Sequence, residues 1–236
     1  MFTGIVELMG TVAEYNLQDN SASGGQGVSV TIKGASAILN DCHIGDSIAC
    51  NGICLTVTAF DKDTFKVGIS PETIVRTDVA DWVAGTRINL ERAVSQDVRF
   101  GGHYVQGHVD TVASIVSVTP EGNSLVFGFK LRDSQYEKFI VEKGFICIDG
   151  TSLTVTQVDA DGTFYIAMIA HTQDVVVMPL KKIGSLVNIE VDLTGKLIEK
   201  QISVALQNQF NDSHSTLNNL IEKIIDEKVQ KYLSKK

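Results

Sequence analysis

Two short stretches of the chain carry small polar side chains at every second position, and they are the strongest candidates for chemistry. Cys54–Thr58 and Ser152–Thr156 each alternate a thiol or hydroxyl with leucine or valine. An alternation of period two predicts a strand that buries one face and presents the other. Thiols and hydroxyls offer hydrogen bonds without charge or bulk, which suits a flat heterocycle with a polyol arm.

A solvated barrel exterior would show the same alternation, because threonine suits strands in general. One stretch alone does not separate the two interpretations. The same pattern at matched places in both stretches favours a face that binds a ligand.

The two stretches belong to a longer internal repeat. Its matched blocks follow one another in the same order at a nearly constant spacing. They are Thr3–Glu7 with Gln106–Asp110, Asn51–Thr58 with Asp149–Thr156, Thr64–Phe65 with Thr163–Phe164, and Gly85–Glu91 with Gly184–Glu190. We predict two homologous domains with a boundary near Ser95–Asp97: a first domain over 1–95, a second over 96–197, and a tail over 198–236.

Each half is predicted to be rich in strands. Asn51-Gly52, between Ser47–Cys50 and Ile53–Thr58, indicates a tight two-residue hairpin turn. Many short strands separated by glycine and aspartate turns indicate a small antiparallel barrel in each half. A short helix over 134–140, capped at Asp133-Ser134, is expected in the second half.

The tail has a helical pattern. Apolar residues recur at helical spacing from Leu217 to Tyr232, with Ser213 and Ser215 as candidate N-caps, and a shorter stripe spans Ile198–Leu206. A helix packed on its own barrel and an oligomerisation helix both fit this pattern. Because the tail lies outside both repeats, an oligomerisation helix is at least as good an interpretation as a helix packed on its own barrel.

Composition narrows the class of partner. A formal net charge of −8 disfavours nucleic acid and anionic membranes, and an aromatic content of 7% argues against a base-stacking platform. No run approaches the roughly 20 apolar residues of a membrane span. The first residues lack the basic start of a secretory signal, so we expect a cytoplasmic protein with reduced thiols.

Metal and cofactor motifs are not found in the sequence. A hairpin at Asn51-Gly52 would put the thiols of Cys50 and Cys54 on opposite faces of the sheet. The odd separation of His103 and His108 would do the same on a strand. Gly24–Gly27 lacks the residues of a phosphate loop. We predict no metal and no cofactor.

The chain resembles the riboflavin synthase family of lumazine-binding barrels. The resemblance rests on Met1–Glu7, the repeated blocks, Gly101–His103 and Gly107–Val109, and it extends over the whole chain. It implies a mainly β fold, with two six-stranded antiparallel Greek-key barrels and C-terminal helices. It also implies a homotrimer formed through those helices, with sites between subunits.

The activity that the resemblance implies is a transferase reaction, the last step of riboflavin biosynthesis. Two molecules of 6,7-dimethyl-8-ribityllumazine would dismutate by four-carbon transfer to riboflavin and 5-amino-6-ribitylamino-uracil. A non-catalytic lumazine- or flavin-binding antenna protein is the alternative. Such proteins tend to lose one of two sites, whereas both polar strand faces are kept here.

The family's ligand contacts carry over residue by residue. In the first half they fall on Gly4, Ile5, Val6, Cys54, Leu55, Thr56, Gly68, Ile69, Ser70, Pro71, Glu72 and Thr73. In the second half they fall on Gly107, His108, Val109, Lys143, Ser152, Leu153, Thr154, Met168, Ile169, Ala170, His171, Thr172 and Gln173. The family often has glutamate where His171 stands, so the role of that side chain is open.

The candidate catalytic residues are Cys54, His108, Lys143, Ser152 and Asp192. The base is a histidine or a bound water, and the nucleophile that adds at C7 of one ring is water, Ser152 or Cys54. The sequence does not choose among these, nor does it say which half-site is the donor.

The two repeats differ in their ionisable groups. The second has His108, Lys143, Asp149 and Asp192 where the first has Ile5, Gly45, Asn51 and Ala93. Neutral drift explains such differences on a surface. However, each of these ionisable groups lies in or beside a stretch that the family uses for ligand contact. This suggests the hypothesis that the first barrel binds its ligand without charged groups, whereas the second supplies charge to the reacting ring and the ribityl arm.

Overall fold

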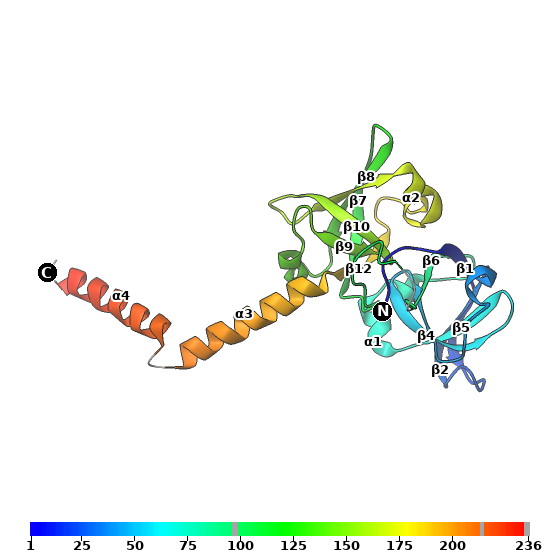
Figure 1. Cartoon of the computed structure of the whole chain (residues 1–236), viewed down its shortest axis with the longest axis horizontal. Coiled ribbons are helices and arrows are strands. Elements are labelled where there is room, and N and C mark those ends of the chain that lie inside the picture. The colour runs from blue at the N-terminus through cyan, green and yellow to red at the C-terminus, as the bar shows by residue number, and fades with distance from the viewer. Residues whose placement is uncertain (96–98, 213–214, 234–236) are drawn as a thin grey trace. The chain divides into compact units, whose positions relative to one another are not determined.

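The computed structural model describes residues 1–95, 99–212 and 215–233, and it forms two compact units. Met1–Asp192 holds two β-barrels, and Leu193–Lys236 holds the helices of the tail (Figure 1). The predicted domain boundary near Ser95–Asp97 lies partly outside the described residues.

The strands of the first barrel form a closed ring in the order β1-β2-β5-β4-β3-β6. They are β1 (Leu8–Asp19), β2 (Gly27–Lys33), β3 (Ser47–Cys50), β4 (Ile53–Phe60), β5 (Thr64–Ile69) and β6 (Arg87–Arg92). Neighbouring strands pair antiparallel. The helix α1 (Pro71–Arg76) and the 3₁₀ turns Ser36–Ile38 and Val79–Asp81 join them. Strand β2 pairs with β5 rather than β3, which gives the Greek-key connection.

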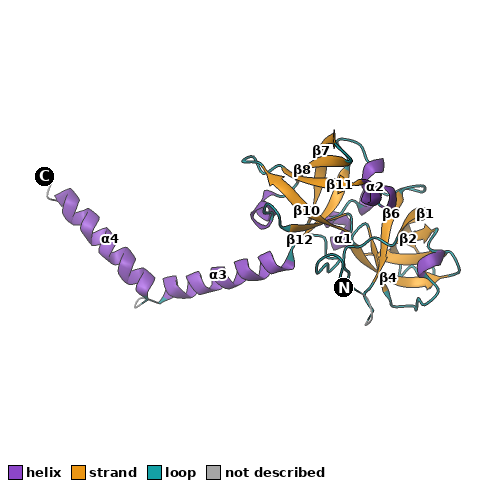
Figure 2. Cartoon of the chain, turned by 45° about the horizontal axis from the view of Figure 1, so that its top comes forward, coloured by secondary structure: helices purple, strands orange, loops and turns teal. Residues whose placement is uncertain are grey.

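The second barrel repeats this order as β7-β8-β11-β10-β9-β12. Figure 2 shows the strands of the barrels in orange. Its strands are β7 (Thr111–Glu121), β8 (Ser124–Leu131), β9 (Phe145–Ile148), β10 (Thr151–Val158), β11 (Phe164–Ile169) and β12 (Leu186–Val191). Helix α2 (Ala170–Val175) and the 3₁₀ turn Met178–Leu180 match their counterparts in the first barrel. The prediction of two six-stranded Greek-key barrels is therefore confirmed.

The helix expected at 134–140 differs in kind. Residues Ser134–Phe139 form a 3₁₀ helix, without a capping hydrogen bond from the Asp133 side chain. The Asp133 carboxylate instead accepts a hydrogen bond from the Thr111 hydroxyl at 2.7 Å. A side chain engaged with a distant strand is not available to cap, and sequence pattern does not reveal that competition.

The predicted hairpin turn at Asn51-Gly52 is confirmed, and its counterpart Asp149-Gly150 packs directly against it. Asn51 and Asp149 adopt left-handed φ values of 45° and 46°. A Cβ on Gly52 would lie 2.6 Å from the backbone nitrogen of Gly150, and a Cβ on Gly150 would lie 2.8 Å from that of Gly52. Only glycine allows the two turns to approach this closely.

Reciprocal asparagines join the barrels around these turns. Asn89 donates from its side chain to the carbonyl of Asp149 at 2.8 Å, and Asn188 donates to that of Asn51 at 3.0 Å. The side chains of Asn51 and Asp149 accept from the backbone N–H groups of Asn89 and Asn188, each at 2.7 Å. The interface therefore has a local two-fold pattern that reflects the sequence repeat.

One buried ion pair breaks this symmetry. The Lys181 ammonium lies 2.6 Å from the Asp149 carboxylate and 3.4 Å from that of Asp78. Trp82 stands at the matched place in the first half and donates to Asp78 at 3.0 Å. Asp149 is fully buried, and burial raises its pKa to about 6 against the opposing effect of Lys181. The hypothesis that Asp149 supplies charge to a ligand is therefore wrong, because its carboxylate is enclosed between the barrels.

The tail consists of α3 (Leu193–Asn211) and α4 (Thr216–Leu233). The Ser215 hydroxyl accepts from the backbone of Asn218 at 3.1 Å, the geometry of an N-cap, whereas Ser213 lies outside the described residues. Apolar side chains along both helices are exposed, among them Ile198, Ile202 and Ile224. Within the described ranges, no helix combines the length and apolar character needed to cross a membrane.

Asp149→Asn tests the cost of the buried carboxylate, and Asn51 shows that asparagine suits this backbone. The folded pKa of about 6 exceeds the ordinary 3.8, so protonation favours the folded state. The Asp149 contribution to stability is present below pH 4 and is lost as pH rises towards 6. Relative to Asp149→Asn, the natural protein should therefore lose free energy of unfolding between pH 4 and 7, measured by urea denaturation. The exposed Asp81→Asn is the control, and a constant difference across this range would contradict the assignment.

Candidate active site

Strands β4 and β10 present the two polar faces as predicted. Leu55 and Val57 point into the first core, while Thr56 is exposed and Cys54 is half-buried. In β10 the alternation is the same, with Leu153 and Val155 buried, Thr154 exposed and Ser152 half-buried. Both polar faces therefore point away from the barrel cores, with Thr56 and Thr154 exposed to solvent.

The start of each half lies on the other barrel. We call residues 3–6 and 106–109 the opening segments. The Gly4 carbonyl of the first accepts a hydrogen bond from the Ser152 N–H at 2.7 Å, and Val6 packs against the second core. A Cβ on Gly4 would lie 2.6 Å from the Ser152 Cβ. The first opening segment therefore covers the tip of β10.

The second opening segment makes the reciprocal contact. The Gly107 carbonyl accepts from the Cys54 N–H at 2.8 Å, and Val109 packs against the first core. The structure thus groups Gly4–Val6 with Ser152–Thr154 and Gly107–Val109 with Cys54–Thr56. Sequence order suggested the opposite grouping, because nothing in the repeat indicates that the segments exchange partners.

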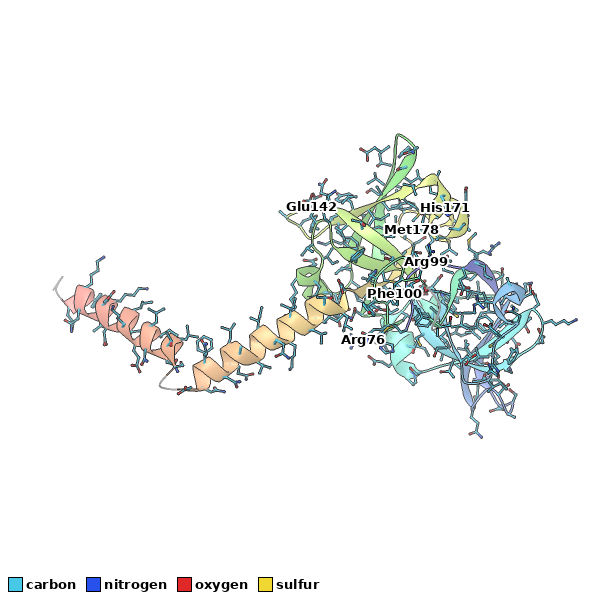
Figure 3. The ribbon with its side chains drawn as sticks, in the orientation of Figure 1. Arg76, Arg99, Phe100, Glu142, His171 and Met178 are labelled. Atoms are coloured by element: carbon cyan, nitrogen blue, oxygen red, sulfur yellow. The ribbon has the colours of Figure 1, made fainter. Side chains whose placement is uncertain are left out.

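The remaining predicted contact stretches flank the same faces. Gly68–Thr73 begins on β5, beside β4, and the Ser70 hydroxyl caps α1 by accepting from Thr73. Met168–Gln173 begins on β11, beside β10, and Gln173 donates to the Met168 carbonyl at 2.7 Å. His171 is exposed on α2, on the second barrel (Figure 3).

Lys143 has an unusual backbone. Its φ of 65° is left-handed, and the matched residue in the first half is Gly45, with a φ of 99°. Its N–H donates to the Val155 carbonyl at 2.8 Å, which ties the residue to β10. A lysine where glycine would relieve strain is typical of a functional position.

From the sequence, His103 is an improbable metal ligand with no role beyond its place in the Gly101–His103 motif, whereas the structure places it at the tip of β10. Its Nδ1 lies 2.7 Å from the Ser152 hydroxyl, and its ring stacks on Phe145 with centroids 5.1 Å apart. The ring is buried, which lowers its pKa below the usual 6.5, and the negative charge of Asp192 opposes that shift. His103 is therefore mainly neutral at pH 7 and able to exchange a proton with Ser152.

The prediction that His103 and His108 point to opposite faces of one strand is wrong, because neither residue lies on a strand. Residues 101–104 and 106–110 are not strand, and only an isolated bridge between Phe2 and Val105 occurs nearby. His108 is exposed, and its N–H donates to the Glu190 carboxylate at 3.0 Å. Among the described residues, no cluster of histidine, cysteine and acidic side chains has the arrangement of a metal site.

A cavity of about 410 Å³ adjoins the first opening segment. Ile5 lines it, together with Ala93, Arg92 and Gly101. Its other walls come from the first barrel and the connection between the barrels, not from β10. The cavity therefore shares Thr3 and Ile5 with the opening segment that covers the tip of β10, but it includes no residue of β10.

A family comparison matches both halves. The lumazine binding domain model covers residues 3–93 and 106–192. Riboflavin synthase of Saccharomyces cerevisiae is 70% identical over 238 residues, with all of both chains covered.

The chain belongs to the riboflavin synthase family.

More distant members support the same assignment. Riboflavin synthase of Bacillus subtilis is 43% identical, covering 89% of this chain and 93% of its own. The solved structure of LumP complexed with riboflavin has a TM-score of 0.71 at 23% identity, and it covers 81% of this chain and all of its own. That likeness shows the fold alone. The curated members are enzymes, and the chain is accordingly an enzyme of the transferase class.

Gly107→Ala tests the close approach of an opening segment to the opposite barrel. A Cβ there would meet the Cys54 Cβ at 2.6 Å, on a backbone with φ of 76°. Gly34 has the same φ with no atom within 4 Å, so Gly34→Ala is a matched control. We expect the free energy of unfolding, measured by urea denaturation, to fall by about 1 kcal/mol in the control. In Gly107→Ala it should fall by about 1–3 kcal/mol more. Equal losses would show that strain, not contact between barrels, requires glycine.

Proposed function

We propose that the chain converts two molecules of 6,7-dimethyl-8-ribityllumazine into riboflavin and 5-amino-6-ribitylamino-uracil, the last step of riboflavin biosynthesis. The observation that carries the proposal is the doubled polar strand face, each copy covered at its tip by the other half's opening segment. A reaction between two copies of one molecule requires two similar binding places. Membership of the riboflavin synthase family supports the same reaction.

The proposed binding places follow the grouping in the structure. Half-site one comprises Cys54–Thr56, Gly68–Thr73 and Gly107–Val109. Half-site two comprises Gly4–Val6, Lys143, Ser152–Thr154 and Met168–Gln173. Each combines a strand tip, an opening segment and the start of a short helix, which together offer both apolar walls and hydrogen-bonding groups.

Catalysis in this arrangement is mainly positioning. Holding two rings face to face converts a bimolecular reaction into one of high effective molarity. The four carbons leave one ring system and join the other, and the two products contain all the atoms of the two substrates. No external oxidant or reductant is needed. Proton transfers from an acidic C7 methyl group and to the leaving nitrogens are the tasks left for the protein.

Ser152 and His103 are suited to those tasks in half-site two. Their 2.7 Å contact allows the histidine to accept the hydroxyl proton as the Ser152 oxygen adds to C7 of the bound ring, and to return that proton when the oxygen leaves. The Asp192 charge stabilises the cationic form of His103 when it accepts the proton. We propose His103 as a catalytic residue, besides Ser152, Lys143, Asp192, His108 and Cys54.

The crossed grouping of segments changes the hypothesis of a neutral first barrel and a charged second one, because the ionisable groups of the second half are then divided between the two half-sites. His108 follows Gly107, which contacts Cys54, so its ionisable side chain belongs to half-site one. Lys143 and Asp192 remain with half-site two. The two half-sites thus differ in kind: half-site one contains a thiol and an exposed histidine, and half-site two contains a hydroxyl in contact with a buried histidine.

We also propose that the chain assembles as a homotrimer through its tail, with half-site one of one subunit facing half-site two of a neighbour. Exposed apolar side chains along α3, such as Leu197, Ile198 and Ile202, support an association surface. A cytoplasmic location is proposed from the biosynthetic role of the family. It is supported by the free thiols of Cys42, Cys50, Cys54 and Cys147, which suit a reducing compartment.

The reaction itself is tested by incubating the protein with the lumazine and following the absorbance and fluorescence of riboflavin. We expect Ser152→Ala and His103→Gln each to lower kcat about 100-fold, the usual scale for lost acid–base catalysis. The double variant should be no slower than either single one, because the two side chains act as a unit. Ser36→Ala, at an exposed hydroxyl of the first barrel, is the control.

Failure of the natural protein to form riboflavin would contradict the proposed function. If the natural protein forms riboflavin and the kcat of Ser152→Ala lies within threefold of its kcat, only the proposed catalytic role of the Ser152–His103 pair is contradicted.

Deletion of residues 198–236 tests the role of the tail. The barrels should keep their circular dichroism spectrum, because Met1–Asp192 is compact by itself. Sedimentation should show a smaller association state, and riboflavin formation should be lost if half-sites meet between subunits. Deletion of 215–236 alone separates the contribution of α4. A fully active trimer without 198–236 would disprove the assignment.

A further inference from the structure

Two buried glutamates hold the opening segments in place. Glu91 is the second-last residue of β6. Its carboxylate accepts from the Thr3 N–H at 2.7 Å, the Thr3 hydroxyl at 2.8 Å and the Gly4 N–H at 3.1 Å. Glu190, at the matched position of β12, accepts from Gln106 at 2.7 Å, Gly107 at 2.9 Å and His108 at 3.0 Å, all through backbone N–H groups.

These carboxylates are nearly inaccessible to solvent, with exposed fractions of 5% for Glu91 and 3% for Glu190. Burial raises the pKa of Glu91, whereas its hydrogen bonds from Thr3 and Gly4 lower it. A buried carboxylate is costly unless donors replace its water. Here the donors are backbone N–H groups and the Thr3 hydroxyl, in two segments whose glycines, Gly4 and Gly107, adopt left-handed φ values of 78° and 76°.

Each glutamate therefore fixes a segment whose far side contacts the other barrel. Glu91 binds the N–H of Gly4, and the Gly4 carbonyl contacts Ser152 of the second barrel. Glu190 binds the N–H of Gly107, and the Gly107 carbonyl contacts Cys54 of the first barrel. One glycine in each half thus links a glutamate of its own barrel to the polar strand tip of the opposite barrel.

We propose that Glu91 and Glu190 are crossed positioning residues: Glu190 shapes half-site one, and Glu91 shapes half-site two. The inference rests on the proposed function for the identity of the half-sites. The contacts themselves do not depend on which ligand binds there. A merely structural glutamate would affect its own barrel first, so the crossed effect is the distinguishing property.

Glutamine is the informative substitution. It keeps the shape of the side chain, but its NH₂ group cannot accept the N–H of an opening segment, so at least one of the three hydrogen bonds is lost. The segment should then open over the opposite strand tip while the barrel remains folded, which circular dichroism would check.

Thiol labelling reads the crossed effect without substrate. Cys50 and Cys147 are buried, so in a Cys42→Ser background Cys54 is the half-buried thiol that reports on half-site one. We expect Glu190→Gln to raise the rate of Cys54 modification by 5,5′-dithiobis(2-nitrobenzoate) about tenfold, and Glu91→Gln to leave it within twofold. With Cys54→Ser and Ser152→Cys added to that background, the two glutamine variants should exchange their effects. An increase from the glutamate of the same barrel, or equal increases from both, would overturn the proposal.

Riboflavin as a probe ligand connects the positioning role to binding. Riboflavin should protect Cys54 from the reagent, and Glu190→Gln should raise the concentration needed for half protection about tenfold, with Glu91→Gln unchanged. Loss of protection in both variants would contradict the crossed assignment. If riboflavin gave no protection in the natural glutamate background, half-site one would be misassigned, and the labelling rates alone would still decide the positioning role.

Discussion

The exchange of opening segments between the barrels is the constraint on which the rest of the molecule depends. Each segment satisfies a backbone N–H at the tip of a foreign strand, through Gly4 to Ser152 and through Gly107 to Cys54. Each also places a valine against the foreign core. Neither barrel is therefore complete at its polar face without the other. Two domains that look independent in the sequence form one compact unit.

The close contact of the barrels has its own requirement at the hairpin turns. Gly52 and Gly150 approach one another where no side chain would fit, and asparagine side chains saturate the surrounding backbone. Some matched positions in this local two-fold pattern carry unlike residues. In the second half, Lys181 forms ion pairs with two buried carboxylates, Asp78 of the first half and Asp149 of its own, whereas Trp82 occupies the matched place in the first half. Because a buried charge is costly without its partner, these differences favour pairing of unlike barrels.

The same combination of symmetry and difference suits a reaction between two identical molecules. Similar strand faces can hold similar rings, while unlike neighbours can treat the two rings differently. The clearest case is the buried His103, which contacts Ser152, compared with the exposed His108, which follows the Gly107 that contacts Cys54. Burial lowers the pKa of His103, so the protonation of this side chain depends on its place in the fold and not on its residue type alone. Position in the fold thus gives different surroundings to matched residues of the two proposed half-sites.

Much of this architecture is determined by the sequence itself. The alternation in Cys54–Thr58 and Ser152–Thr156, the turn at Asn51-Gly52 and the ordered repeat are local, and they predicted the strands, the hairpin and the paired barrels. These features depend on periodicity and on φ preferences that neighbouring residues fix. The charged pattern of the second repeat was visible too, but its meaning was not.

The tertiary structure alone decided which residues meet. Asp149 looks like a ligand-binding acid in the repeat, yet Lys181 encloses it between the barrels. His103 gave no signal beyond its neighbouring glycines, yet it contacts Ser152, and Glu91 and Glu190 look like ordinary strand residues. The opening segments cross to the opposite barrels through single backbone hydrogen bonds and one packed valine each. Such contacts join residues far apart in the chain. Because the two halves offer similar partners, the sequence pattern does not show whether a segment binds its own barrel or the opposite one.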